Sequence, residues 1–212
     1  MRSIANVVVA AAALLLVGCA SGGTRTVDLS YTPPAAVTSA SGSAAVSKRI
    51  ALATFVDARE KTDRIGFTKS SSGDVIYVPK GASLAEAVTE AVAARLGAEG
   101  YTVTRLGSAW DPRSGEVPSA DADLVVGGVV EEFYGESDGN VIWSPADTDV
   151  RLVVAVASPK EQRIIGQSVI RSSLDGTTTS ASLPANLRER FLAAVEQVPL
   201  APGLGSSLSG AR

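Results

Sequence analysis

Histidine is absent from this sequence, and cysteine occurs once, at position 19. Without histidine the chain lacks the commonest general base, His-ligated metal sites and the Ser-His-Asp and Cys-His arrangements of nucleophilic enzymes. A single thiol excludes an intramolecular disulfide and a multi-cysteine metal site. We therefore expect no catalytic residues, no metal and no cofactor apart from a covalent lipid, and we predict that the protein is not an enzyme.

Long runs of one charge are also absent. Lys and Arg number 19 against 22 Asp and Glu, which gives a formal net charge of −3. No basic stripe is available to follow a phosphate backbone, so nucleic acid is not an expected partner.

The N-terminal residues have the pattern of an export signal. Arg2 supplies a positive charge, and residues 4–17 are apolar apart from Asn6. This stretch is shorter than a bilayer-spanning helix requires. It leads into Leu16-Val17-Gly18-Cys19, which fits the lipobox of bacterial lipoprotein signals. We predict that residues 1–18 are removed and that Cys19 carries the lipid, palmitate included. The alternative is an ordinary cleaved signal followed by an unrelated cysteine.

The residue after the predicted lipidation site bears on location. In the usual enterobacterial sorting rule an Asp there retains a lipoprotein at the inner membrane, and this chain has Ala20. We therefore expect anchoring at the periplasmic face of the outer membrane rather than at the inner membrane. Two or three acyl chains anchor a protein stably, because each buried CH₂ contributes about 0.8 kcal/mol.

Composition divides the remainder into three parts. Residues 19–48 are rich in Ser, Gly, Ala, Thr and Pro, which predicts a lipidated flexible tether spanning roughly 30 Å root-mean-square. The apolar island at 27–31 offers an alternative, docking on the domain as an edge strand. Residues 49–198 carry the patterns of a single α+β domain, and 199–212 those of a disordered tail.

Periodicity predicts the elements of that domain. Helical spacing and a capping box of Ser83 and Glu86 indicate a helix over 83–97, and a second helix begins near 182. Strands are predicted at 49–56, 75–78, 101–106, 124–134, 140–143, 148–156 and 163–172, with a surface loop over 107–120. Consecutive strands joined by short turns pair antiparallel. The predicted fold class is α+β, a mostly antiparallel sheet of about five strands with two helices packed on one face.

Several short motifs resemble the YajG-type family of bacterial outer-membrane lipoproteins. They are Asp57-Ala58-Arg59, Arg64-Ile65-Gly66, residues 96–101, residues 123–126 with Phe133-Tyr134, and Asn140-Val141. The resemblance covers most of residues 50–198 and implies an outer-membrane lipoprotein of a largely uncharacterised family. The loop at 107–118 and the C-terminal tail depart from the family pattern. The order of elements is also similar to that of periplasmic modules that regulate cell-wall synthases or assemble secretion pores, a fold-level analogy.

Four side chains are candidates for binding. Arg59 either binds an anionic ligand or pairs with a nearby carboxylate, and Asp57 caps the turn after the first strand. Tyr134 and Trp143 flank a predicted loop and form either a binding hot spot or ordinary core packing. Among the carboxylates, Glu131 and Glu132 are adjacent on a predicted strand and so should face opposite sides, which argues against a paired acid and base.

These observations lead to three hypotheses of different class. The first is a membrane-anchored periplasmic lipoprotein that acts as a non-enzymatic interaction or assembly module of the cell envelope, with an envelope protein as partner. The alternative is a periplasmic domain that binds a small molecule or a glycan through the loop at 57–74. A hydrolase that uses carboxylates alone ranks third.

Overall fold

The computed structural model describes residues 22–34, 48–140, 144–174, 177–178 and 180–199. Cys19, Trp143 and the predicted strand residues 141–143 lie outside these ranges. The strands are β1 (Gly23–Val27), β2 (Arg49–Thr54), β3 (Val56–Asp57), β4 (Gly66–Lys69), β5 (Val75–Pro79), β6 (Thr102–Ala109), β7 (Leu124–Asp138), β8 (Ser144–Ser158), β9 (Arg163–Leu174) and β10 (Thr177–Thr178). The helices are α1 (Leu84–Ala98) and α2 (Leu183–Glu196), with single 3₁₀ turns at Pro112–Ser114 and Ser180–Ser182.

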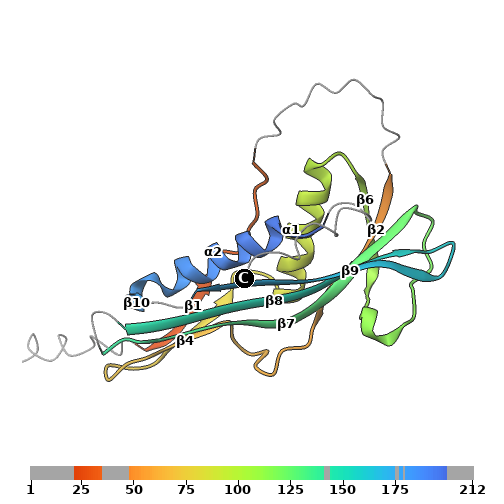
Figure 1. Cartoon of the computed structure of the whole chain (residues 1–212). Helices are drawn as coiled ribbons and strands as arrows, with labels where there is room; N and C mark the ends of the chain where they lie inside the picture. The colour runs from red at the N-terminus through yellow and green to blue at the C-terminus, as the bar shows by residue number, and fades with distance from the viewer. Residues whose placement is uncertain (1–21, 35–47, 141–143, 175–176, 179, 200–212) are drawn as a thin grey trace, which may run out of the picture.

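The strands form a mixed sheet around the long strand β7 (Figure 1). On one side β7 pairs antiparallel with β8, and β8 pairs antiparallel with β9 and with β10. On its other side three strands run parallel to it, with β2 near its start, β3 in the middle and β4 at its end. Beyond them, β6 pairs parallel with β2, while β5 pairs antiparallel with β4 and parallel with β1.

The predicted sheet, mostly antiparallel and of about five strands, is therefore wrong. Short turns do join β4 to β5 and β8 to β9, and only five residues separate β7 from β8 in the sequence; these three pairs are antiparallel. The path from β2 to β6 instead passes through α1, and residues 110–123 lead from β6 to β7. Connections of this length let the chain return in the same direction, which makes the strands parallel.

Part of the predicted tether belongs to the fold. The strand β1 pairs with β5, and Val27 and Leu29 are buried in the main core. The Tyr31 hydroxyl donates a hydrogen bond to Glu196 on α2 at 2.6 Å. The island at 27–31 therefore docks on the domain, as the alternative interpretation expected, and the edge strand β1 is formed mainly by the residues just before it. The alternation of Val27, Leu29 and Tyr31 is too short a pattern to predict a docked segment among the surrounding Ser, Gly and Pro.

Both helices lie on one face of the sheet and cover the main core (Figure 1). As predicted, the Ser83 side chain accepts a hydrogen bond from the Glu86 backbone N–H, at 3.2 Å. The apolar face predicted for the second helix is buried; it comprises Leu187, Phe191, Ala194 and Val195 on α2 and Val198 just after it. The predicted face of β8 is buried as well; it comprises Thr148, Val150, Leu152, Val154 and Val156.

A smaller core covers part of the opposite face of the sheet. Trp110, in the predicted surface loop, is 4 % exposed and packs with Val117 over alanines of β2 and β8. A Cβ at Gly127 would lie 2.9 Å from Cε3 of Trp110, so glycine makes room for the indole. A Cβ at the next residue, Gly128, would lie 2.7 Å from Cε1 of Phe55 and 2.0 Å from the carbonyl oxygen of Val153, so glycine is needed there too.

We predict that Leu152→Ala lowers the free energy of unfolding by at least about 2 kcal/mol. Leu152 is fully buried between the sheet and the helices, so truncation leaves a cavity. Urea unfolding followed by circular dichroism measures the loss. The matched control is Val169→Ala on β9, where the side chain is 50 % exposed and the expected change is within about 0.5 kcal/mol. A loss below about 0.5 kcal/mol for Leu152→Ala would mean that the two faces are assigned the wrong way round.

Candidate functional site

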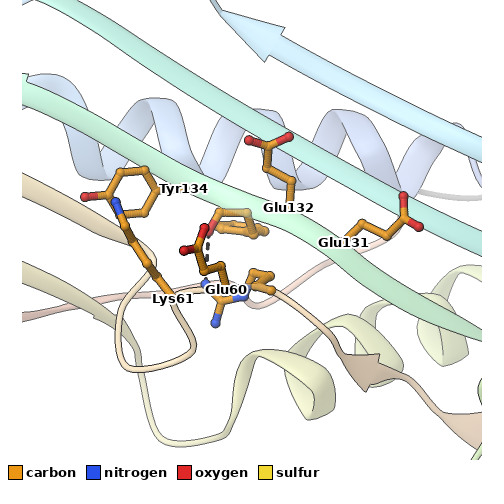
Figure 2. Close-up of a pocket in the computed structure, with 7 residues that line it drawn as sticks. Glu60, Lys61, Glu131, Glu132 and Tyr134 are labelled. Carbon is orange, nitrogen blue, oxygen red and sulfur yellow. Dashed lines mark hydrogen bonds between the residues drawn. The ribbon is translucent and has the colours of Figure 1, made fainter.

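A β-bulge in the middle of β7 shapes the candidate site. The register between β7 and β8 shifts between Val130 and Glu132, which leaves Glu131 as the extra residue. Val130 and Phe133 are both fully buried in the helix-side core. The two residues between them therefore lie on the other face, where Figure 2 shows Glu131 and Glu132 beside a pocket. The prediction that these carboxylates face opposite sides is wrong, because the inserted residue interrupts the alternation.

Arg59 ties the loop after β3 to the middle of β7. Its guanidinium makes a bidentate ion pair with Asp57, with Nε–Oδ1 at 2.8 Å and Nη2–Oδ2 at 2.9 Å. From Nη1 it donates to the carbonyl oxygens of Arg64 at 2.7 Å and Phe133 at 3.0 Å. A longer contact of 3.5 Å joins Nη2 to the carbonyl of Thr62. All five guanidinium N–H groups thus have acceptors within the protein.

These contacts bear on the two interpretations of Arg59. The residue is only 8 % exposed, and its donors are used within the fold. Asp57 also accepts the backbone N–H of Arg59 at 3.3 Å, as a turn-capping carboxylate does. The arrangement supports the structural role for both residues over direct binding of an anion by Arg59.

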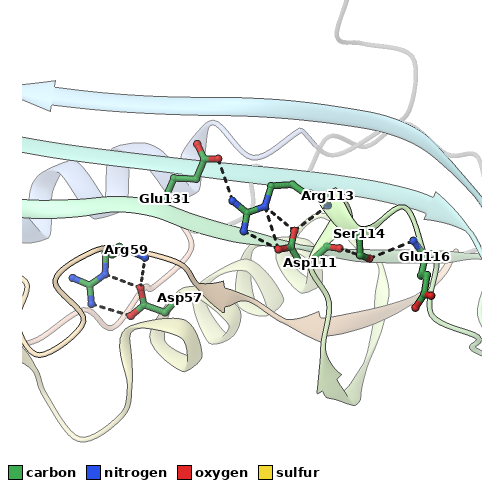
Figure 3. A network of polar contacts seen from close by, with 7 residues as sticks. All are labelled: Asp57, Arg59, Asp111, Arg113, Ser114, Glu116 and Glu131. Carbon is green, nitrogen blue, oxygen red and sulfur yellow. Dashed lines mark hydrogen bonds and ion pairs between the residues drawn. The ribbon is translucent and has the colours of Figure 1, made fainter.

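A second Asp-x-Arg pair, which the sequence analysis did not single out, lies on the same side of the sheet (Figure 3). Arg113 contacts both carboxylate oxygens of Asp111, and this hydrogen bonding lowers the pKa of Asp111. Arg113 also lies 3.7 Å from Glu131, which forms a 3.0 Å ion pair with Arg151. The repeated spacing was visible in the sequence, but its link to Glu131 depends on the bulge.

The pocket has a volume of about 320 Å³ and lies between the Arg59 loop and β7 (Figure 2). It is lined by Arg59, Glu60, Lys61, Glu131, Glu132, Phe133 and Tyr134. Lys61 Nζ lies 4.5 Å from the centroid of the Tyr134 ring, a cation–π distance. Burial, helped by the charge of Glu136, raises the pKa of Tyr134, so its hydroxyl is neutral at physiological pH. The pocket thus combines exposed charges of both signs with one aromatic face.

The structure brings three of the four predicted binding residues to this region. Arg59 and Tyr134 line the pocket, and Asp57 holds Arg59 from behind. Trp143 lies outside the described residues. Within the described ranges, no group of three or more His, Cys, Asp and Glu side chains is placed to hold a metal ion. Neither helix described there has the length and apolar character needed to span a bilayer.

No family model matches the chain, and no curated protein matches its sequence. Among solved structures, protein XCC0632 of family DUF330 from Xanthomonas campestris matches with a TM-score of 0.51 and 13 % identity, over 84 % of this chain and 90 % of that chain. The two proteins share a fold. At this identity the likeness concerns the fold alone.

Two further matches are weaker. A PelC dodecamer from Paraburkholderia phytofirmans gives a TM-score of 0.43 at 15 % identity, covering 73 % of this chain and 86 % of that one. Lipoprotein GNA1162 from Neisseria meningitidis gives 0.40 at 12 % identity, covering 71 % and 97 %. Both TM-scores are below 0.5, and we draw nothing further from them. The resemblance to the YajG-type family stays a prediction.

Proposed function

We propose that the protein is a lipid-anchored periplasmic lipoprotein of the outer membrane and acts as a non-enzymatic interaction or assembly module of the envelope. The tetrapeptide that ends at Cys19 supports the anchor. The buried Arg59 beside the pocket is engaged with Asp57 and with backbone carbonyls, and the partly exposed Glu131 is paired with Arg151, which suits a scaffold. The observation that carries the binding role is the face of β7, β8 and β9 opposite the helices, which we call the open face.

Two rows of side chains cross the open face. Glu132, Arg151 and Arg171 are register neighbours on β7, β8 and β9. A second row joins Val129, Val153 and Val169, and exposure rises along it from 0 % through 3 % to 50 %. An apolar side chain that emerges beside charged ones is the composition of a protein interface with a polar rim. This favours a protein partner.

The proposal predicts that anchoring and partner contact are lost together. In cells, Cys19→Ala should remove the lipid and leave either uncleaved precursor or mature protein outside the membrane fraction. A photo-crosslinking residue at position 169 should yield one discrete adduct in the lipidated protein and much less of it in the Cys19→Ala background. Fractionation and immunoblotting measure both effects.

Two controls make this test specific. Ser21→Ala keeps the thiol and should stay at the membrane, and a crosslinker at Glu86, exposed on α1, should give no such adduct. Membrane recovery of Cys19→Ala at the wild-type level, with the signal removed, would contradict the anchor. Equal adducts from positions 169 and 86 would contradict the open face as an interface.

The pocket supports the alternative, a small polar or glycan ligand. Its volume of about 320 Å³ is at the lower end of the range of small-molecule sites. The loop at 57–74, predicted as the binding element, contributes Arg59, Glu60 and Lys61 to it. Binding of that kind would depend on Lys61 and not on Val169, which distinguishes it from binding of a protein on the open face.

A further inference from the structure

Very little chain separates the predicted lipid from the folded sheet. Cys19 precedes Gly22 by three residues, and β1 begins at Gly23, whose backbone N–H donates to the Asp74 carbonyl at 2.9 Å. One residue spans at most about 3.6 Å of extended chain, so Cys19 lies within about 11 Å of Gly22. A tether of roughly 30 Å, as predicted from composition, is not available in front of β1.

Two turns meet the start of β1 at this end of the sheet. A Cβ at Gly22 would lie 2.9 Å from the carbonyl carbon of Gly73, in the turn between β4 and β5. The backbone N–H of Gly139, after β7, donates to the Lys69 carbonyl at 2.7 Å, and the backbone N–H of Ser71 donates to Asn140 Oδ1 at 2.6 Å. We call Gly22 with residues 69–74 and 138–140 the anchor end (Figure 1, at the left).

The anchor end presents polar groups to solvent. Its exposed side chains include Ser71, Ser72 and Asn140. Arg25 lines a pocket together with Ser72 and Gly73, and its charge and that of Lys69 balance those of Asp74 and Asp138. A surface of hydroxyl and amide groups with no net charge suits the zwitterionic headgroup layer and does not suit the hydrocarbon core.

We infer that the anchor end rests against the phospholipid headgroups and that the long strands lead away from the bilayer. This inference rests on the proposed lipidation of Cys19. β7 has 15 residues, so its other end at Leu124 stands about 45 Å farther out. The turn between β8 and β9, which contains Lys160, lies at the opposite end of the molecule from β1 (Figure 1). The open face is then perpendicular to the plane of the membrane, and a partner protein reaches it from the side.

Site-specific fluorescence quenching tests this orientation. Cys19 is the only cysteine in the chain and is blocked by lipid, so an introduced cysteine is the only free thiol. Ser72→Cys at the anchor end and Lys160→Cys at the far end are labelled with one fluorophore in the full lipidated protein. The labelled proteins are placed in phosphatidylethanolamine and phosphatidylcholine vesicles that carry a headgroup-linked spin-label quencher. We expect at least threefold stronger quenching at position 72 than at position 160.

Two insertions sharpen the test. A 20-residue Gly/Ser segment between Ser21 and Gly22 adds roughly 25 Å of flexible reach, and it should abolish the difference between the two labels. The same insertion between Ser41 and Gly42 follows β1 in the chain, and it should leave the difference intact.

The outcomes separate the anchor from the orientation. Equal quenching at positions 72 and 160 in protein that floats with the vesicles, or identical effects of the two insertions, would overturn the orientation and leave the lipoprotein proposal standing. Protein that does not float with the vesicles at all would contradict lipidation, and the orientation with it.

Discussion

Arg59→Met will lower the free energy of unfolding by about 3–5 kcal/mol, whereas Arg113→Met will lower it only slightly. Both arginines are two residues after an aspartate and pair with it through both carboxylate oxygens. The side chains of Arg59 and Asp57 are 5 % and 20 % exposed, against 45 % and 31 % for Arg113 and Asp111. Loss of Arg59 leaves a largely buried carboxylate and the carbonyl of Phe133 without their partner, while water replaces the exposed guanidinium.

Urea unfolding of the two variants measures this contrast. Methionine fills much of the volume of the arginine stem, so the difference reports on the polar contacts rather than on a cavity. Asp57→Asn should lower the free energy of unfolding much less in the Arg59→Met background than in the wild type, because the ion pair is already broken there. Similar losses for Arg59→Met and Arg113→Met would show that the Arg59 pair is as well solvated as the surface pair.

Trp110→Ala will cost about 3–5 kcal/mol of unfolding free energy, again measured with urea. The indole is almost completely buried, and its Nε1 donates to the Glu116 carbonyl at 2.6 Å, so one side chain both covers the sheet and holds the loop. The loop over 107–120 would tolerate this change within about 0.5 kcal/mol if it were only a surface connection.

Gly127 supplies the control for Trp110. In the wild type a methyl group at Gly127 would come within 2.9 Å of the indole. Gly127→Ala should therefore be destabilising alone and better tolerated together with Trp110→Ala, where the ring is gone. Strictly additive losses would mean that the two residues do not share this space.

The helices and the hairpin could be predicted because their sequence patterns involve residues only a few positions apart. The start of α1 depends on the hydrogen bond between Ser83 and Glu86, three positions apart, and the buried face of α2 depends on the helical repeat. The hairpin of β8 and β9 likewise follows from alternation on both sides of a short turn. Such signals are readable because each residue and its partner are near in sequence.

The candidate site depended on longer-range events. Asp57, Arg59 and Tyr134 were singled out from the sequence, but the role of Arg59 rests on the Phe133 carbonyl, 74 residues away along the chain. A one-residue bulge on β7 moved Glu131 and Glu132 to the same face, and no residue pattern near them marked it. Bulge position is set by how two strands register over their whole length.

By itself the sequence determined the two helices, most strands and which side chains of β8 and α2 are apolar, because these depend on motifs and periods of two to four residues. The lipobox that ends at Cys19 stays a prediction from the sequence. The tertiary structure decided between a free tether and an edge strand for the segment around β1, and it alone showed that β7 receives parallel neighbours and that Trp110 covers the second face. In each case, segments that are far apart in the sequence compete to cover the same apolar surface and to pair the same backbone N–H and C=O groups. Their outcome is a property of the whole chain, because only the folded sheet shows which edge and which face remain to be covered.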